Sequence, residues 1–179
     1  LYLQRDQSEA RYSRMNDILK PEITAMKNLI QSCSNNESKG ILAFIDVHHH
    51  SQRRGAFMYG PCHPMQSSKY LEVRVLPKLI SMMLPEIFRF QSCQFKNQSF
   101  KENCARLFAD REMGIQYSFC LECSQQGYYT QEKEKLKLNA QESSKFRHVK
   151  YFDQESLMLL GRKVCEAANV LNEMCDVQD

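Results

Sequence analysis

The chain has 179 residues, 42% of them hydrophobic, and a formal net charge of +3 at pH 7. This length is enough to bury a core and is typical of one domain. No apolar run is long enough to cross a membrane, and the interleaving of basic with acidic residues does not favour nucleic-acid binding. We therefore expect a single domain over residues 1–179, monomeric, with neither a membrane nor a nucleic acid as its partner.

The eight cysteines are spread along the chain. An even number can indicate disulfides, but several cysteines lie within apolar patterns and the chain is large for a disulfide scaffold. Reduced thiols in the cytosol are the favoured interpretation. Cys120 and Cys123 form a lone Cys-x-x-Cys pair, whereas a structural zinc site needs a second pair or suitably spaced histidines.

A first helix is predicted to begin at Pro21, because proline lacks the N–H that would be unpaired in a first helical turn. Glu22 beside it suits the positive end of the helix dipole. Four apolar residues follow at helical spacing and should face the core. They are Ile23, Met26, Ile30 and Cys33.

After a turn-rich loop, the apolar run 40–45 predicts a strand over residues 41–47 that is buried on both faces. A polar cluster, Asp46-Val-His48-His49-His50-Ser51, begins where the apolar run stops. In open α/β sheets, ligands and catalytic groups collect at the carboxyl ends of the strands. Helix, loop and strand together predict one step of an α/β fold.

The polar cluster has the composition of a metal site. Neutral imidazole is a good zinc ligand, and a nearby carboxylate such as Asp46 can fix its tautomer. Three adjacent histidines are equally compatible with a solvated surface loop. The motif alone therefore leaves both interpretations open.

The basic stretch 52–55 leads into the apolar residues 56–60. A second helix is predicted over Leu76–Leu84, with Pro77 near its start and Pro85 at its end. Its apolar face comprises Leu76, Leu79, Ile80 and Met83. Residues 88–95 alternate between apolar and polar types, which predicts a short extended segment.

Ser99 and Glu102 match a capping box, in which the serine and the glutamate bond reciprocally to the first backbone N–H groups of a helix. The helix is predicted over residues 105–112, and Gly114 lies where glycine commonly ends a helix.

Apolar residues alternate with polar or small ones over residues 115–122, which predicts a further strand. Glu122 lies where this pattern stops. By itself, a glutamate at a strand end is commonly a solvated carboxylate.

The charged run 131–137 predicts a solvated loop or a short helix, and His148 is expected in a loop without a role. Asp153 suits the cap of a last helix. The helix's apolar positions are Leu157, Leu160, Val164, Ala168, Leu171 and Cys175.

The segment from Asp46 to Gly60 resembles a segment of the cytosolic carboxypeptidases, which belong to the zinc carboxypeptidase family and remove glutamates from protein tails, tubulin above all. The family pattern is Asp-Phe-His-Gly-His-Ser, two or three basic residues, a short spacer and Phe-Met-Tyr-Gly. The first histidine of that pattern, a zinc ligand, falls on His48. His49 stands where the family has glycine, which is expected to place a bulkier, titratable group beside the metal.

A second segment, Ala105–Glu122, is similar to the family pattern Ala-Arg, several apolar residues, Arg-Glu-Ile-Gly-Val-Gln and Arg-Ser-Tyr-Thr-Met-Glu. The last glutamate of this pattern, the general base, falls on Glu122. Its distance from His48 is 122 − 48 = 74 residues, which suits the family's order of strands. Arg106 matches an arginine of the pocket for the departing residue, where it would pair with a γ-carboxylate.

The resemblance also implies that Asp46 supports His48 and that His50 and Arg54 contact the substrate. Two alternatives remain open from the residues themselves. Arg106 could be a surface arginine of its helix, and Arg54 could belong to a solvated basic loop.

The implied fold is α/β, a mixed, mostly parallel sheet with helices on both faces, with the chain forming the C-terminal part of the catalytic domain. The family's other zinc ligands, in His-x-x-Glu, and its Asn-Arg pair are expected before Leu1. The implied function is a zinc-dependent carboxypeptidase acting on tubulin or other glutamate-rich tails, in the cytoplasm, at microtubules or at cilia. The alternative is an inactive relative that binds tubulin or another acidic partner.

Overall fold

The computed structural model describes residues 20–34, 40–96, 104–130 and 148–176. The chain divides into two compact units, Leu1–Ile41 and Leu42–Asp179. The described element of the first unit is helix α2 (Pro21–Ser34), which begins at the predicted proline and has Glu22 in its first turn.

The prediction that the apolar stripe of α2 faces the core is wrong for three of its four residues. Ile23, Met26 and Cys33 are exposed, and Ile30 is buried. Helical spacing indicates which side chains share one face of a helix, but it carries no information on whether another surface packs against that face.

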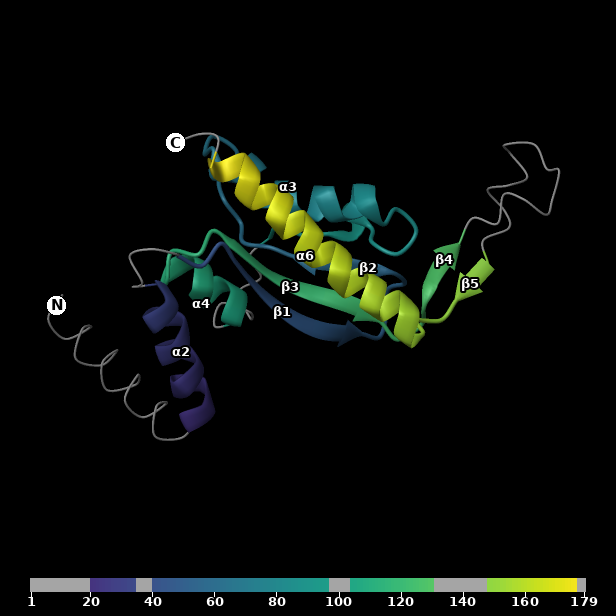
Figure 1. Cartoon of the computed structure of the whole chain (residues 1–179), viewed down its shortest axis with the longest axis horizontal. Coiled ribbons are helices and arrows are strands. Elements are labelled where there is room, and N and C mark those ends of the chain that lie inside the picture. Colours follow the sequence, from purple (N-terminus) through teal and green to yellow (C-terminus); the bar gives the residue numbers. More distant parts are fainter. Residues whose placement is uncertain (1–19, 35–39, 97–103, 131–147, 177–179) are drawn as a thin grey trace, which may run out of the picture. The chain divides into compact units, whose positions relative to one another are not determined.

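The second unit contains a three-stranded mixed sheet, which is shown in Figure 1. The strands are β1 (Ala43–His50), β2 (Ala56–Tyr59) and β3 (Tyr117–Ser124), in the order β1-β3-β2. Strand β3 is central, parallel to β1 and antiparallel to β2.

Helices cover both faces of this sheet. On one face, helices α3 (Lys69–Met83) and α6 (Gln154–Asp176) lie beside each other (Figure 1) and pack against Phe119 and Leu121 of β3. On the other face, helix α4 (Ala105–Arg111) is fastened by the hydroxyl of Ser118, which donates a hydrogen bond to the carbonyl of Arg106. The predicted α/β class, with a mixed sheet between helices, is confirmed.

Strand β1 differs from its prediction in length and in burial. It continues through all three histidines to His50 instead of ending at residue 47, because β3 pairs with it over its full length. It is not buried on both faces, since its residues are half-buried or exposed and Val47 is largely exposed. In the described residues β1 is an edge strand, so its apolar side chains have neighbours from one flank only.

The segment 88–95 is not one continuous extended piece. Isolated parallel bridges join Phe88 to Ala56 and Gln94 to Tyr59, and a short 3-10 turn, η1 (Phe90–Ser92), separates them. Backbone hydrogen bonds at both bridges still cover the outer edge of β2. The predicted extended segment therefore exists only at the two bridges, because the turn η1 separates them.

Helix α3 begins seven residues before the predicted Leu76, since 76 − 69 = 7, and Pro77 lies in its interior. By itself, a proline predicts the start of a helix, because its missing N–H is least costly in a first turn. Here Pro77 is fully buried in the helix's core face, together with Leu76 and Ile80. Burial of this face offsets the helical hydrogen bond that the proline cannot make.

Helix α4 begins at Ala105, as predicted, and ends at Arg111, shortly before Gly114 with its positive φ of 69°. The capping box of Ser99 and Glu102 lies outside the described residues.

Helix α6 confirms both its predicted cap and most of its predicted core face. The backbone N–H of Ser156 donates to Asp153 Oδ1 at 2.8 Å, and the N–H of Asp153 donates to Ser156 Oγ at 3.0 Å. Leu160 and Val164 are buried, whereas Leu157, which was expected to face the core, is exposed. Ser156 and Leu160 are buried in the same turns of the helix, so Leu157 lies to one side of the face that α6 buries.

The cap of α6 predicts an acid-dependent loss of stability. Hydrogen bonds from the Ser156 hydroxyl and N–H lower the pKa of Asp153 from 3.8 to about 2. Because the folded pKa lies below the unfolded one, this stabilisation is complete above about pH 4 and is lost as the pH falls through about 2. We expect Asp153→Asn to unfold at lower urea concentration than the parent at pH 6, with the difference shrinking towards pH 2. Glu173→Gln, an exposed change on the same helix, should show no such convergence.

Strands β4 (Tyr128–Thr130) and β5 (His148–Lys150) form an antiparallel pair beyond the end of the main sheet. His148 therefore lies in a strand and not in the predicted loop. This strand forms by pairing with residues distant in sequence, which the local pattern does not indicate. The turn before β4 requires Gly127, because its φ is 78° and an added Cβ would collide with the backbone carbonyl of Lys150. The charged run 131–137 lies outside the described residues.

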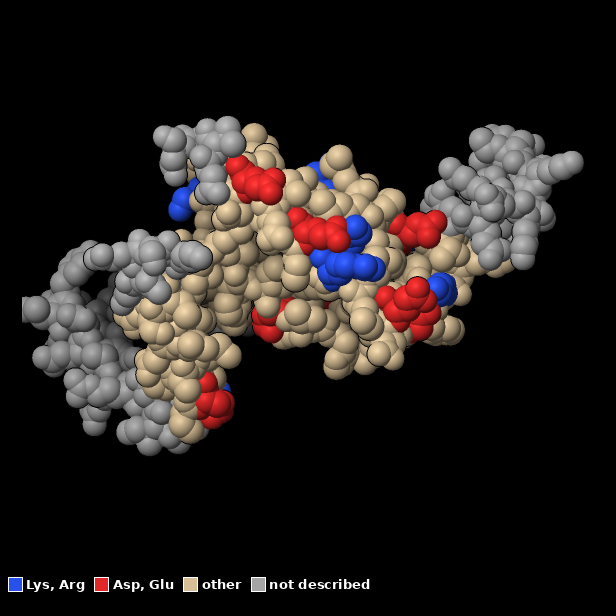
Figure 2. Space-filling model, viewed as in Figure 1, with Lys and Arg blue, Asp and Glu red and all other residues tan. Residues whose placement is uncertain are grey.

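Both signs of charge are interspersed on the face shown in Figure 2. The described helices include none whose length and apolar character suit a membrane span. All eight cysteines are free thiols.

Candidate metal and catalytic site

The candidate site is formed by side chains that strand alternation brings to one face of β1 and β3. Because side chains of a strand point alternately to its two faces, Asp46, His48 and His50 share one face of β1. The parallel register pairs Asp46 with Cys120, His48 with Glu122, and His50 with Ser124. The zinc ligand and the general base implied by the sequence are therefore direct neighbours across two strands.

Glu122 is buried, with 8% of its surface exposed, and lies inside β3 instead of at its end. The strand continues for two more residues because β1 and β2 pair with it on either side. The thiol of Cys120 lies 3.6 Å from Glu122 Oε1 and donates to it, and His50 Nδ1 lies 3.8 Å from Oε2. Both carboxylate oxygens thus have a polar neighbour.

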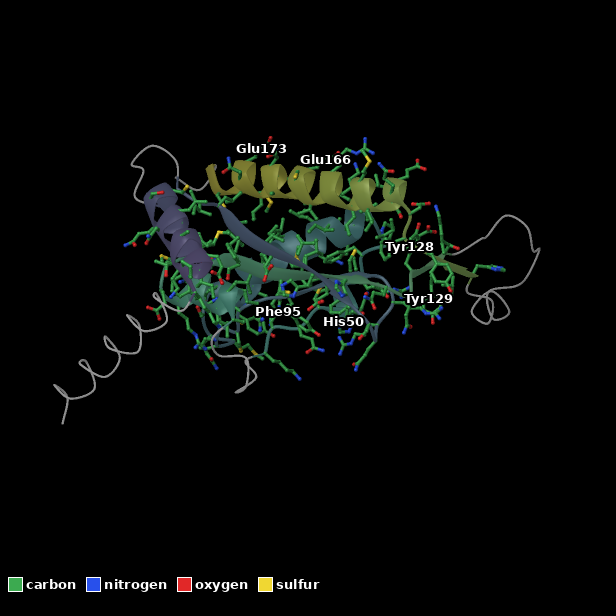
Figure 3. All side chains as sticks on the ribbon, turned by 90° about the horizontal axis from the view of Figure 1, so that it is seen from below. His50, Phe95, Tyr128, Tyr129, Glu166 and Glu173 are labelled. Atoms are coloured by element: carbon green, nitrogen blue, oxygen red, sulfur yellow. The ribbon has the colours of Figure 1, made fainter. Side chains whose placement is uncertain are left out.

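His50 lies on the side of the sheet away from α6, whereas Glu166 and Glu173 lie on α6 itself (Figure 3). Its ring packs edge-on against Phe57, with the ring centroids 5.1 Å apart. Its Nε2 is buried and has no hydrogen-bond partner in the described structure. A buried polar atom without a partner is unusual and is suited to bonding a ligand group.

His48 is positioned by Asp46. The His48 Nε2 and Asp46 Oδ2 atoms are 3.0 Å apart, which orients the imidazole, and 55% of the His48 side chain remains accessible. A histidine held by a carboxylate in this way is the usual arrangement of a metal ligand. The residues present fit a metal ion, because donor atoms of Asp46, His48 and Cys120 all lie within 4.8 Å of one another.

His49, which replaces the glycine of the family pattern, does not lie beside this cluster. The register pairs it with Cys123, so strand alternation directs its side chain to the opposite face from His48 and Glu122. The expectation that His49 places a bulky, titratable group next to the metal is therefore wrong, because its side chain lies on the other face of the strand.

Cys120 was missed by the sequence reasoning, which considered it only in a pair with Cys123. Those two cysteines are three residues apart in one strand and therefore face opposite ways. Burial, followed by the nearby Glu122 and Asp46 carboxylates, raises the pKa of Cys120 to about 12, so it is a neutral thiol at pH 7. The signal that could have identified it is its two-residue spacing from Glu122.

Arg106 is buried, with 6% of its surface exposed, so the interpretation as a surface arginine is wrong. Its guanidinium carbon lies 5.8 Å from the centre of the Tyr59 ring, and the register places Tyr59 opposite Cys120. None of the salt bridges among the described residues includes Arg106, and its Nε is buried without a hydrogen-bond partner. Burial raises the pKa of Tyr59, and Arg106 and Arg53 oppose this shift.

Arg54 is not brought into this cluster. Its guanidinium lies over the ring of Tyr129 on β4, 5.0 Å from the ring centre. In Figure 3, Tyr129 lies nearer to the β4–β5 pair than His50 does. Arg53, its neighbour, donates from Nη1 to the carbonyl of Ser92 at 3.1 Å and lies over Phe57. Both arginines lie in the loop between β1 and β2, where Arg53 is exposed and Arg54 is half-buried.

A solved structure shares this mixed sheet with helices on both faces. A metallo-carboxypeptidase from Burkholderia cenocepacia superimposes with a TM-score of 0.58 at 18% identity, over 86% of this chain and 35% of that chain. The likeness shows that the described part of the chain has this fold.

Sequence comparison narrows the assignment. Mouse cytosolic carboxypeptidase 2 is 32% identical over 156 residues, 87% of this chain and 16% of the relative. Mouse cytosolic carboxypeptidase 3 is 34% identical over 108 residues, 58% of this chain and 10% of the relative. Human cytosolic carboxypeptidase 2 is 31% identical over 140 residues, 78% of this chain and 13% of the relative. No protein-family model matches the chain.

The chain belongs to the cytosolic carboxypeptidase family. It spans between 10% and 16% of the length of these curated relatives.

Proposed function

We propose that this chain is part of a zinc-dependent metallocarboxypeptidase that removes C-terminal or side-chain glutamates from acidic protein tails such as those of tubulin. The observation that carries the proposal is the register of β1 and β3, which pairs His48 with Glu122 on one face of the sheet. Hydrolysis needs a metal ligand and a general base side by side, and this pairing supports those roles for His48 and Glu122.

His48 is the proposed zinc ligand, with Asp46 holding its imidazole through the 3.0 Å contact. When bound, zinc supplies a Lewis acid that polarises the scissile carbonyl and lowers the pKa of water at the site.

Glu122 is the proposed general base. It would accept the proton of the attacking water and pass it to the leaving amine, which requires one carboxylate to act first as base and then as acid. Its burial, with 8% of its surface exposed, keeps bulk water away from the carboxylate. His50, 3.8 Å from Oε2, would contact the substrate through its unpartnered Nε2.

Arg106 is the proposed origin of the preference for glutamate. A buried guanidinium without a carboxylate partner is costly, and the γ-carboxylate of a substrate glutamate would supply the missing charge. Arg54, held over Tyr129, would contact acidic residues further along the substrate tail. We also propose a cytoplasmic, monomeric enzyme at microtubules or cilia, without membrane or nucleic-acid partners.

The direct test is glutamate release by a protein that contains this chain together with the rest of its carboxypeptidase domain. Glutamate should be released from polyglutamylated tubulin, the activity should disappear on incubation with a zinc chelator, and added Zn²⁺ should restore it. Absence of release by a folded, zinc-loaded protein would overturn the proposal. Tubulin binding by that inactive protein would instead establish the alternative, a non-catalytic relative.

A further inference from the structure

Three potential metal donors of different chemistry meet on the polar face of the sheet. Asp46 of β1 and Cys120 of β3 are register partners, and His48 lies two residues further along the same face. A carboxylate oxygen, a thiol sulfur and a ring nitrogen of these residues all lie within 4.8 Å of one another. The family resemblance assigns no ligand role to Asp46 or Cys120.

We propose that Asp46, His48 and Cys120 together form a metal site of this chain's own, which selects Zn²⁺, Co²⁺ or Cd²⁺ over Mg²⁺ and Ca²⁺. The proposal rests on the proposed function for the ligand role of His48, but it needs no residue outside the chain.

The geometry suits a tetrahedral ion. Metal–ligand bonds of about 2.0–2.3 Å place neighbouring donors about 3.3–3.8 Å apart in a tetrahedron. The present separations, up to 4.8 Å, are close enough for side-chain rotations to close around an ion without moving the strands. Three protein donors leave a fourth position open, and the 55% accessible side chain of His48 provides the entry.

The donor set determines the selectivity. Thiolate and imidazole ligands favour zinc and neighbouring late transition metals, whereas Mg²⁺ and Ca²⁺ prefer sites made entirely of oxygen ligands. As the sulfur–metal bond forms, the thiol proton must leave. Glu122 Oε1, 3.6 Å from the Cys120 sulfur and already accepting its hydrogen bond, is placed to take that proton and release it to solvent.

Cys123 provides a matched control. It is the same residue type in the same strand, and it faces the apolar core on the opposite side of the sheet. Replacement of Cys123 by serine therefore removes a thiol near the site without removing a donor from the proposed cluster.

The test is Co²⁺ titration of the reduced 179-residue chain, followed by near-ultraviolet absorption. Cobalt bound to thiolate gives a sulfur-to-metal charge-transfer band, which we expect in the parent chain and in Cys123→Ser but not in Cys120→Ser. Excess Mg²⁺ should leave the band unchanged and Zn²⁺ should abolish it by displacement. Absence of the band in the folded parent chain, or its full persistence in Cys120→Ser, would overturn the proposal.

Two further variants keep the test decisive if Cys120→Ser does not fold. His48→Ala removes a largely exposed side chain and should weaken Co²⁺ binding at least about tenfold, the lower range for loss of a group that holds a metal. Unchanged affinity in His48→Ala would contradict the site. Glu122→Gln should lose turnover in the complete domain while its charge-transfer band remains, so failure of the catalytic proposal and failure of the metal proposal give different results.

Discussion

Replacement of Glu122 by glutamine should reduce glutamate release by about 10²–10⁴-fold, the usual contribution of a general acid–base group. Glutamine has the same shape, and its amide oxygen can still accept the hydrogen bond that Cys120 donates at 3.6 Å. It cannot accept a proton from water at neutral pH. The measurement is kcat on glutamate-ended substrates, in the protein with the complete domain and bound zinc.

The matched control is Glu173→Gln, the same chemical change on the exposed side of α6, away from the polar face (Figure 3). It should leave kcat unchanged. Zinc content near that of the parent, together with an unaltered thermal transition, would show that Glu122→Gln removes chemistry and not structure. If turnover is unaffected, Glu122 is not the base.

Arg106→Ala should lower kcat/KM for glutamate-ended substrates. The expected loss of transition-state stabilisation is about 2–5 kcal/mol, the range for removing one partner of a buried charge pair. Substrates with apolar ends should be affected little, because they offer no γ-carboxylate for the guanidinium. The contact between α4 and the sheet should survive, since Ser118 donates to the backbone carbonyl of Arg106 and not to its side chain. The measurement is the ratio of kcat/KM values for the two substrate classes.

Arg106→Lys separates charge from geometry, because an ammonium keeps the positive charge but cannot form two parallel hydrogen bonds to a carboxylate. We expect it to recover part of the glutamate preference. Arg162→Ala, an exposed change on α6, should have no effect on the ratio. An equal loss on glutamate and apolar ends in Arg106→Ala would indicate a structural role for the arginine.

The boundaries that sequence predicted well are those set by local chemistry. Pro21 begins α2, Asp153 caps α6, and the alternation over residues 115–122 identified most of β3. Each signal depends on neighbouring residues only. Pro77 shows the limit of such signals, because a proline that would start an isolated helix lies inside α3, where burial of the helix's core face offsets its missing hydrogen bond.

The candidate site divides in the same way. Alternation within each strand, which the sequence determines by itself, already places Asp46, His48 and His50 on one face and Cys120 and Glu122 on another. The sequence also contains the two motifs through which the family was recognised.

Only the tertiary structure decided that these two faces coincide. Pairing of β1 with β3, and its register, join residues more than seventy positions apart, and this depends on long-range packing that no local pattern encodes. The same packing buried Glu122 and Arg106 and left β1 at the edge of the described sheet. A strand's own residues fix which side chains share a face, but the free energy of burying that face against particular neighbours selects its partner and register.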